Sequence, residues 1–202
     1  MALYKGEDKI KDIYLGDVPI FKVYAGEEFC GFFTFSHENL ISNSHLIIDS
    51  NSDNIPDGFT YADATDISLV NGIAKFTATA QHGCIRQLTP NVFNTVNGNT
   101  YYFYSKVKTI TADCKMLLSG VGQDTSIVND GNWQFTSKIF TASSSYSGTG
   151  VRINDASASD FTPIEVDYMG AINITDLISR GILPSGLTNS QYKDILDNYF
   201  NS

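Results

Sequence analysis

The residue types with the clearest potential for chemistry lie in one short loop, DSNSDNIPDGF. It holds Asp49, Asn51, Asp53 and Asp57 ahead of Gly58. Hard cations such as Ca²⁺ take six to eight oxygen ligands, and carboxylates at alternate positions of a tight loop can converge on one ion. The spacing matches the first half of an EF-hand loop but lacks its glycine at the sixth position and its glutamate at the twelfth. Two interpretations stay open: a structural Ca²⁺ site, and a solvated loop whose Asp and Asn side chains form their own turns.

Aromatic residues beside lysines indicate a second kind of site. In the strand-like run TYYFYSKVKTI, alternation places Tyr102 and Tyr104 on the same face as Lys106 and Lys108, so we expect that face to be exposed. The tyrosines could stack on a sugar ring or pack against cross-strand neighbours. Trp133, the only tryptophan, begins another strand, where it could stack on a sugar or close one end of a core. Tyr102, Tyr104 and Trp133 are the candidate glycan-binding residues.

Catalytic groups are harder to find in the sequence. His37, His45 and His82 lie far apart, and none belongs to a G-x-S-x-G or H-E-x-x-H motif. Glu165 and Asp167 alternate with apolar residues, which is typical of the outward face of a strand more than of a glycosidase pair. The sequence therefore predicts a protein without enzymatic activity, and a polysaccharide hydrolase is the least favoured alternative.

Composition limits the partners. The chain has 202 residues and a net charge of −9, which repels phosphate backbones and anionic lipids, and no local run of basic residues offsets it. No apolar run reaches the length of a signal peptide or a membrane span. We therefore expect a soluble protein that binds no nucleic acid and enters no membrane. Cys30, Cys84 and Cys114 lack disulfide or zinc spacing, which predicts buried free thiols.

The N-terminus repeats a Tyr-x-Gly-acid unit every ten residues, starting at Tyr4, Tyr14 and Tyr24. Apolar residues such as Ile13 and Val23 precede the turns, so each unit reads as a strand and a reversal. A meander of three short strands buries only one face and is marginal alone. We expect these five residues to attach the protein to a partner or to copies of itself. The alternative is that these strands simply begin the main sheet.

The rest of the chain divides into a β-rich region and a helical end. Seven strand-like runs between turn-forming clusters predict an all-β sandwich or barrel, at residues 72–80, 84–90, 100–110, 114–122, 133–142, 150–156 and 164–174. Near the C-terminus, Thr188 or Asn189 can cap a helix with an apolar stripe at Tyr192, Ile195, Leu196 and Tyr199. The expected division is a mounting element at residues 1–35, a sandwich at 36–173, and a turn with an amphipathic helix at 174–202.

Three segments resemble parts of one group of proteins. KIKDIYLGDVPIFKVYAGEEF is similar to the Tyr-x-Gly-acid repeats that open small structural proteins of phages and prophages of Gram-positive and related bacteria. NLISNSHLIIDSNSDNIPDGFTY, NGNTYYFYSKVK and GNWQFTSKIFTA resemble the carbohydrate-binding-module-like jelly rolls of phage tail and adhesion proteins. The C-terminal segment from Ile164 resembles the end of those domains. Two departures are SRGILPSG, where a Gly-Ala-Gly-Asn-Glu-Pro run is usual, and Phe59 in place of tryptophan.

The resemblance implies a bacteriophage virion protein with an antiparallel jelly-roll β-sandwich, an N-terminal β-ribbon and a short C-terminal helix. It implies a location at the tail or baseplate and binding to a host cell-surface glycan. The alternative within the same group is a capsid decoration or head-fibre protein with a purely structural role. Expected partners are other virion proteins and copies of the same chain, as a trimer. Such folds serve many roles, so the resemblance alone does not imply a bound sugar.

Overall fold

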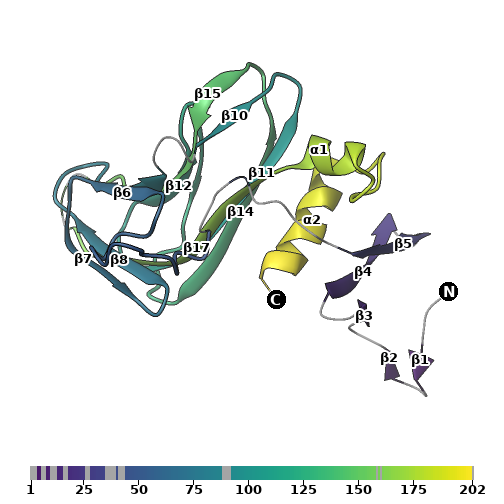
Figure 1. Cartoon of the computed structure of the whole chain (residues 1–202), viewed down its shortest axis with the longest axis horizontal. Coiled ribbons are helices and arrows are strands. Elements are labelled where there is room, and N and C mark those ends of the chain that lie inside the picture. Colours follow the sequence, from purple (N-terminus) through teal and green to yellow (C-terminus); the bar gives the residue numbers. More distant parts are fainter. Residues whose placement is uncertain are drawn as a thin grey trace. The chain divides into compact units, whose positions relative to one another are not determined.

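A computed structural model describes residues 4–5, 8–9, 13–15, 18–25, 28–34, 40, 44–87, 92–157, 159 and 161–201, and between residues 4 and 34 it describes only the backbone of strands. The chain divides into two compact units (Figure 1). One unit is residues 39–173, and the other combines residues 1–38 with 174–202.

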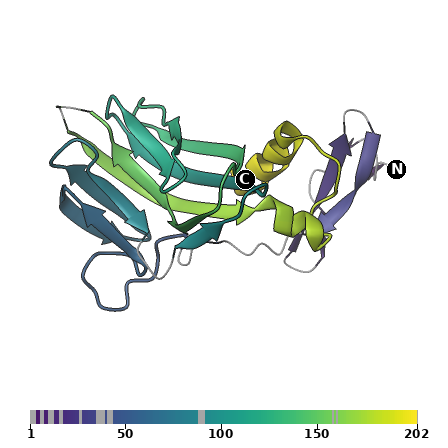
Figure 2. The same ribbon diagram turned by 90° about the horizontal axis from the view of Figure 1, so that it is seen from above.

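The unit of residues 39–173 is an antiparallel jelly-roll β-sandwich, seen from two directions in Figures 1 and 2. Its first sheet has the order β14-β11-β17-β8-β7, with β14 (Trp133–Thr141), β11 (Thr100–Thr109), β17 (Pro163–Asn173), β8 (Ile73–Ala78) and β7 (Ala64–Val70). The second has the order β13-β12-β16-β9-β6, with β13 (Gln123–Ser126), β12 (Cys114–Leu118), β16 (Val151–Asp155), β9 (Cys84–Gln87) and β6 (Phe59–Ala62). A separate pair joins β10 (Phe93–Thr95) to β15 (Tyr146–Thr149). All seven predicted runs contain a strand, and the all-β fold class is confirmed.

A two-residue turn sets the register of the β7–β8 hairpin. Val70 pairs with Ile73 across Asn71 and Gly72, whose φ angles are 52° and 78°. Both angles are positive, as the tight hairpin turn that matches strand twist requires. A Cβ on Gly72 would also lie 2.6 Å from Ile47 Cγ2, so this position needs glycine for space as well as for conformation.

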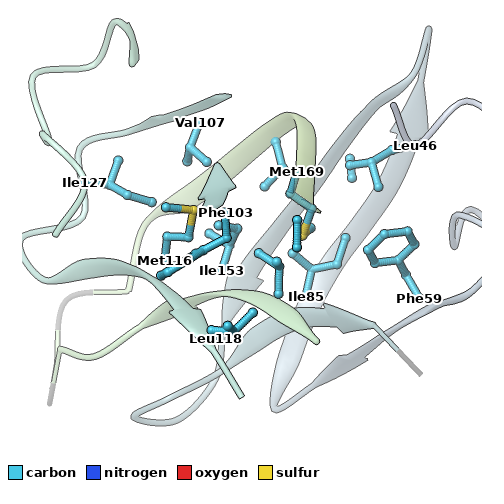
Figure 3. Close-up of a cluster of buried hydrophobic side chains, with 14 of the residues drawn as sticks. Leu46, Phe59, Ile85, Phe103, Val107, Met116, Leu118, Ile127, Ile153 and Met169 are labelled. Carbon is cyan, nitrogen blue, oxygen red and sulfur yellow. The ribbon is translucent and has the colours of Figure 1, made fainter. Parts of the chain in front are cut away.

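The core lies between the two sheets (Figure 3). Phe103 and Val107 of β11 and Met169 of β17 come from the first sheet, and Met116 of β12 and Ile153 of β16 from the second. All five side chains are fully buried. Because side chains alternate along a strand, the residues next to Phe103 and Val107 project from the other face of the first sheet.

Two of the three cysteines are buried in the sandwich. Cys84 and Cys114 are free thiols, as predicted, and the side chain of Cys30 lies outside the described part of the chain. Burial raises the pKa of both described thiols. At neutral pH these thiols are therefore protonated and behave as small apolar side chains.

The N-terminal strands form sheets of their own. β1 (Tyr4–Lys5) pairs with β2 (Asp8–Lys9), and β3 (Ile13–Leu15), β4 (Val18–Ala25) and β5 (Glu28–Thr34) form a three-stranded antiparallel sheet. Among the described residues, none of these strands pairs with a strand of the two large sheets, which does not favour the alternative in which they begin the main sheet. The residues predicted to attach the protein lie in β1, β3 and β4, and their side chains are outside what the structure describes: Tyr4, Ile13, Tyr14, Val23 and Tyr24.

Two helices follow the sandwich, α1 (Ile174–Ser179) and α2 (Asn189–Phe200). Thr188 caps α2, and its hydroxyl accepts a hydrogen bond from the backbone N–H of Gln191 in a complete capping box. Tyr192 and Leu196 are buried, as the predicted stripe requires. The six residues of α1 were expected to form a turn. Neither described helix has the length and apolarity needed to cross a membrane.

Candidate functional site

The outer face of the first sheet gathers aromatic and charged side chains from three strands. In the ladder between β11 and β14, Lys108 pairs with Trp133 and Lys106 pairs with Phe135. On the other side of β11, Lys106 pairs with Tyr168 of β17. Residues directly opposite in an antiparallel ladder project from the same face, so the register itself brings these five side chains together.

The two lysines lie beside the rings of Trp133 and Tyr168. Lys106 Nζ is 6.0 Å from the ring centroid of Trp133 and 5.7 Å from that of Tyr168, and Lys108 Nζ is 6.0 Å from that of Trp133. Trp133 and Tyr168 are both half-buried, so part of each residue remains accessible. At these distances the ammonium groups interact with the ring faces, each contact contributing about 0.5–1 kcal/mol at an exposed position.

Carboxylates hold the lysines in place. Lys106 Nζ is 3.2 Å from Asp167 Oδ2, and Lys108 Nζ is 3.4 Å from Glu165 Oε2. About a third of each side chain is exposed, and such ion pairs typically contribute only about 0–1 kcal/mol to stability. Their main effect is therefore local, because they fix the ammonium groups beside the rings and compensate their charge.

A hydrogen-bonded turn sets the start of β14, where Trp133 lies. The carboxylate of Asp130 accepts hydrogen bonds from the backbone N–H of Asn132 and from the side-chain amide of Gln134, both at 2.9 Å. These bonds lower the pKa of Asp130 because they stabilise its charged form. Asn132 and Gln134, on either side of Trp133 in the sequence, are thus both held by the ionised carboxylate of Asp130 at neutral pH.

A β-bulge explains how Tyr168 reaches this face. The pairing of β11 with β17 shifts between Lys106 and Val107, and both Asp167 and Tyr168 are half-exposed as a result. Simple alternation from Glu165 assigns Asp167 outward and Tyr168 inward, so the sequence pattern alone does not place this tyrosine on the outer face. Burial, with a smaller contribution from Asp167, raises the pKa of Tyr168 to about 12. Its phenol is therefore a neutral hydrogen-bond donor at physiological pH.

Tyr102 and Tyr104 lie on the predicted face, but they are buried, with exposed fractions of 0% and 3%. The ring of Tyr104 packs against Tyr102, Tyr168 and Phe135, at centroid distances of 5.6, 6.0 and 6.3 Å. The expectation of an exposed face is therefore right at the lysine end and wrong at these two tyrosines. Tyr104 makes cross-strand aromatic contacts, and Tyr102 packs against Tyr104 along the same strand. Trp133 is the predicted glycan residue that is only half-buried.

Replacing Tyr104 is therefore expected to change stability. Tyr104→Ala removes a buried ring and should lower the free energy of unfolding by about 3–5 kcal/mol. Tyr104→Phe keeps the ring and should cost at most about 1.5 kcal/mol. Urea denaturation followed by circular dichroism measures both. An alanine variant as stable as the wild type would contradict the buried position.

The four residues of the predicted Ca²⁺ site occupy one exposed loop, where their oxygens accept hydrogen bonds from the loop itself. Asp49 accepts from the backbone N–H groups of Asp53 and Asn54, at 3.3 and 3.0 Å. The Asn51 amide donates to Asp53 at 2.9 Å, and Asp57 accepts from the backbone at the start of the loop at 3.1 Å. Within the described residues, no group of three or more His, Cys, Asp and Glu side chains is arranged to hold a metal ion. Ca²⁺ binding stays a prediction.

Thermal unfolding tests the Ca²⁺ prediction. If the loop binds the ion only in the folded state, Ca²⁺ at a hundred times its Kd should raise Tm by about 5–10 °C relative to EDTA. Asp49→Asn should remove the rise, and Asp66→Asn, at an exposed aspartate of β7, should retain it. Equal Tm values in Ca²⁺ and EDTA would leave the solvated loop as the correct interpretation.

The described residues that were considered for catalysis each contact a different partner. The ring of His45 lies 5.6 Å from that of Tyr168, and the ring of His82 contacts a β16 asparagine. Glu165 and Asp167 form the lysine ion pairs. His37 lies outside the described residues.

Comparisons with known proteins show the fold. No family model and no curated protein matches the chain. An arabinose-bound α-L-arabinofuranosidase of family GH51 matches with a TM-score of 0.52 at 11% identity, over 68% of this chain and 26% of the enzyme. The chain thus spans about a quarter of that enzyme's length. The second N-terminal cellulose-binding domain of Cellulomonas fimi β-1,4-glucanase C matches with a TM-score of 0.48 at 8% identity, over 69% of this chain and 96% of that domain. A carbohydrate-binding module of family CBM4 also has a TM-score of 0.48, at 16% identity, over 66% and 99%.

Proposed function

We propose that this chain is a non-enzymatic glycan-binding module and that the outer face of β11, β14 and β17 holds the glycan. The observation that supports it most is the half-exposed indole of Trp133 beside the ring of Tyr168, with Lys106 and Lys108 next to them. Flat aromatic rings with a polar edge suit the alternating apolar and hydroxyl-bearing surfaces of a sugar. The arabinofuranosidase likeness concerns the fold and adds nothing on the ligand.

The polar groups around the rings favour a neutral glycan. Lys106 and Lys108 are each paired with a carboxylate, so the face offers donors and acceptors with little net charge. Because these groups are already fixed by ion pairs, binding a sugar through them costs little additional side-chain entropy.

A glycan array with the full chain tests this proposal, with neutral and acidic polysaccharides as separate panels. We expect neutral glycans to bind. Trp133→Ala should weaken that binding at least about tenfold, because it removes the accessible ring. Tyr146→Ala, at an exposed tyrosine of β15, is the matched control and should bind like the wild type. The proposal fails if no glycan binds, or if both variants bind equally well.

We also propose that the module is carried on a bacteriophage particle at the tail or baseplate. There, the N-terminal strands would join it to other virion proteins and, as a trimer, to its own copies. The support is the repeat at Tyr4, Tyr14 and Tyr24 and the small sheet of β3, β4 and β5, since a three-stranded sheet of this size gains stability from a covering partner. A capsid decoration or head-fibre role uses the same attachment without a glycan.

Deletion of residues 1–33 tests the attachment. The shortened chain should retain the sandwich's circular dichroism spectrum but be lost from particles assembled together with the products of its neighbouring genes. Full-length protein assembled in parallel is the control. Incorporation of the shortened chain at the full-length level would contradict an attachment through these strands.

A further inference from the structure

The outer face of the second sheet places two of the chain's three arginines side by side. Arg86 of β9 pairs directly with Arg152 of β16. Their neighbours Ile85 and Ile153 also pair, and both are fully buried in the core. The arginine side chains therefore project from the opposite, outer face, where Arg86 is exposed and Arg152 half-exposed. Nothing in the linear sequence indicates this pair, because the two strands are distant in the chain.

Carboxylates do not compensate this pair. Like charges directly opposite in a ladder repel each other. The row across the sheet continues from the pair to Thr60 of β6 on one side and to Leu117 of β12 on the other. The next residue in the row, Asp124 of β13, is two strands from Arg152, and its carboxylate is 3.9 Å from Lys115. In the described part of the chain, neither arginine of the pair forms an ion pair.

The guanidinium of Arg152 also has unused hydrogen-bonding capacity. Its Nε is buried and has no hydrogen-bond partner among the residues that the structure describes. Its Nη2 donates to the backbone carbonyl of His82 over a long 3.5 Å, and the His82 ring contacts the Asn154 amide at 3.3 Å. A charged donor removed from water without an acceptor is unfavourable, so this group is well suited to an anion supplied from outside.

The charges of Arg86 and Arg152 both act on the Cys84 thiol. Burial raises the pKa of the Cys84 thiol, and Arg152 and Arg86 both oppose this rise, so both guanidinium groups lie close enough to influence the thiol. Asp63 adds a smaller effect in the opposite direction. The local field is therefore positive, in a chain whose net charge is −9.

We propose that Arg86 and Arg152 form an oxyanion-binding site for a phosphate, sulfate or carboxylate group. Guanidinium groups donate two parallel hydrogen bonds to such anions, and two adjacent guanidiniums can bind one anion from both sides. The bound anion would neutralise the like-charged pair. The site lies on the other sheet from the proposed glycan face and does not depend on it.

Thermal unfolding of the full chain in inorganic phosphate, compared with NaCl at equal ionic strength, tests the site. Phosphate at ten times its Kd should raise Tm by about 3–6 °C above the NaCl value. Sulfate and acetate arms define the anion class. The Tm in galacturonate is compared with the Tm in polygalacturonate. This comparison distinguishes binding of a free carboxylate from binding of a carboxylate carried on a polymer. A Tm that depends only on ionic strength would overturn the proposal.

Variants identify the residues. Arg86→Gln and Arg152→Gln should each lose the phosphate response, and without phosphate they should melt no lower than the wild type because repulsion is relieved. Arg180→Gln is the matched control, since Arg180 is 3.2 Å from Asp176, and it should keep the response. A response retained in both pair variants, or a lower Tm for both without phosphate, would contradict the proposal.

A measurement on the wild-type protein tests the site even if the variants do not fold. In ¹⁵N-edited NMR spectra of the arginine Nε–H groups, phosphate should shift the signals of Arg86 and Arg152 and leave that of Arg180 unchanged. Equal shifts at all three arginines would indicate nonspecific screening and overturn the site.

Discussion

One constraint determines the outer faces of the sandwich. Every second residue of a strand is buried in the core, so the residues between them must point outward. Phe103 and Val107 on one sheet and Met116 and Ile153 on the other are fully buried. A slip of one residue would move them into water and bring lysines or arginines into the core. The apolar core therefore fixes the register of the ladders in the two large sheets, and the register assembles both outer faces.

The two outer faces differ in how their charges are compensated. On the first sheet, lysines alternate with carboxylates and lie beside aromatic rings, so the surface is nearly neutral and amphipathic. On the second sheet, Arg86 and Arg152 are adjacent without carboxylate partners among the described residues. The first arrangement suits a ligand with hydroxyl groups and apolar faces, and the second suits an oxyanion.

Local patterns were enough to predict most of the elements. Strand-like runs bounded by turn residues located the central strands, and the Thr188 cap with its apolar stripe located α2. The faces needed information that no local pattern contains. The bulge that turns Tyr168 outward depends on how β11 pairs with β17, and the arginine pair depends on β9 lying beside β16. Tyr104 shows the limit of alternation. The alternating pattern predicts the face on which this side chain lies, but not the neighbouring rings that bury it.

The most direct measurement is therefore of register in solution. Interstrand nuclear Overhauser effects in the labelled full-length protein would show which residues lie opposite one another in the two sheets. The structure predicts cross-peaks that pair Lys108 with Trp133 and Arg86 with Arg152. Hα–Hα or HN–HN cross-peaks, which join only directly opposite residues, that pair Lys108 with Gln134 or Arg152 with Ile85 would mean that the ladders are shifted by one residue and that neither outer face exists as described.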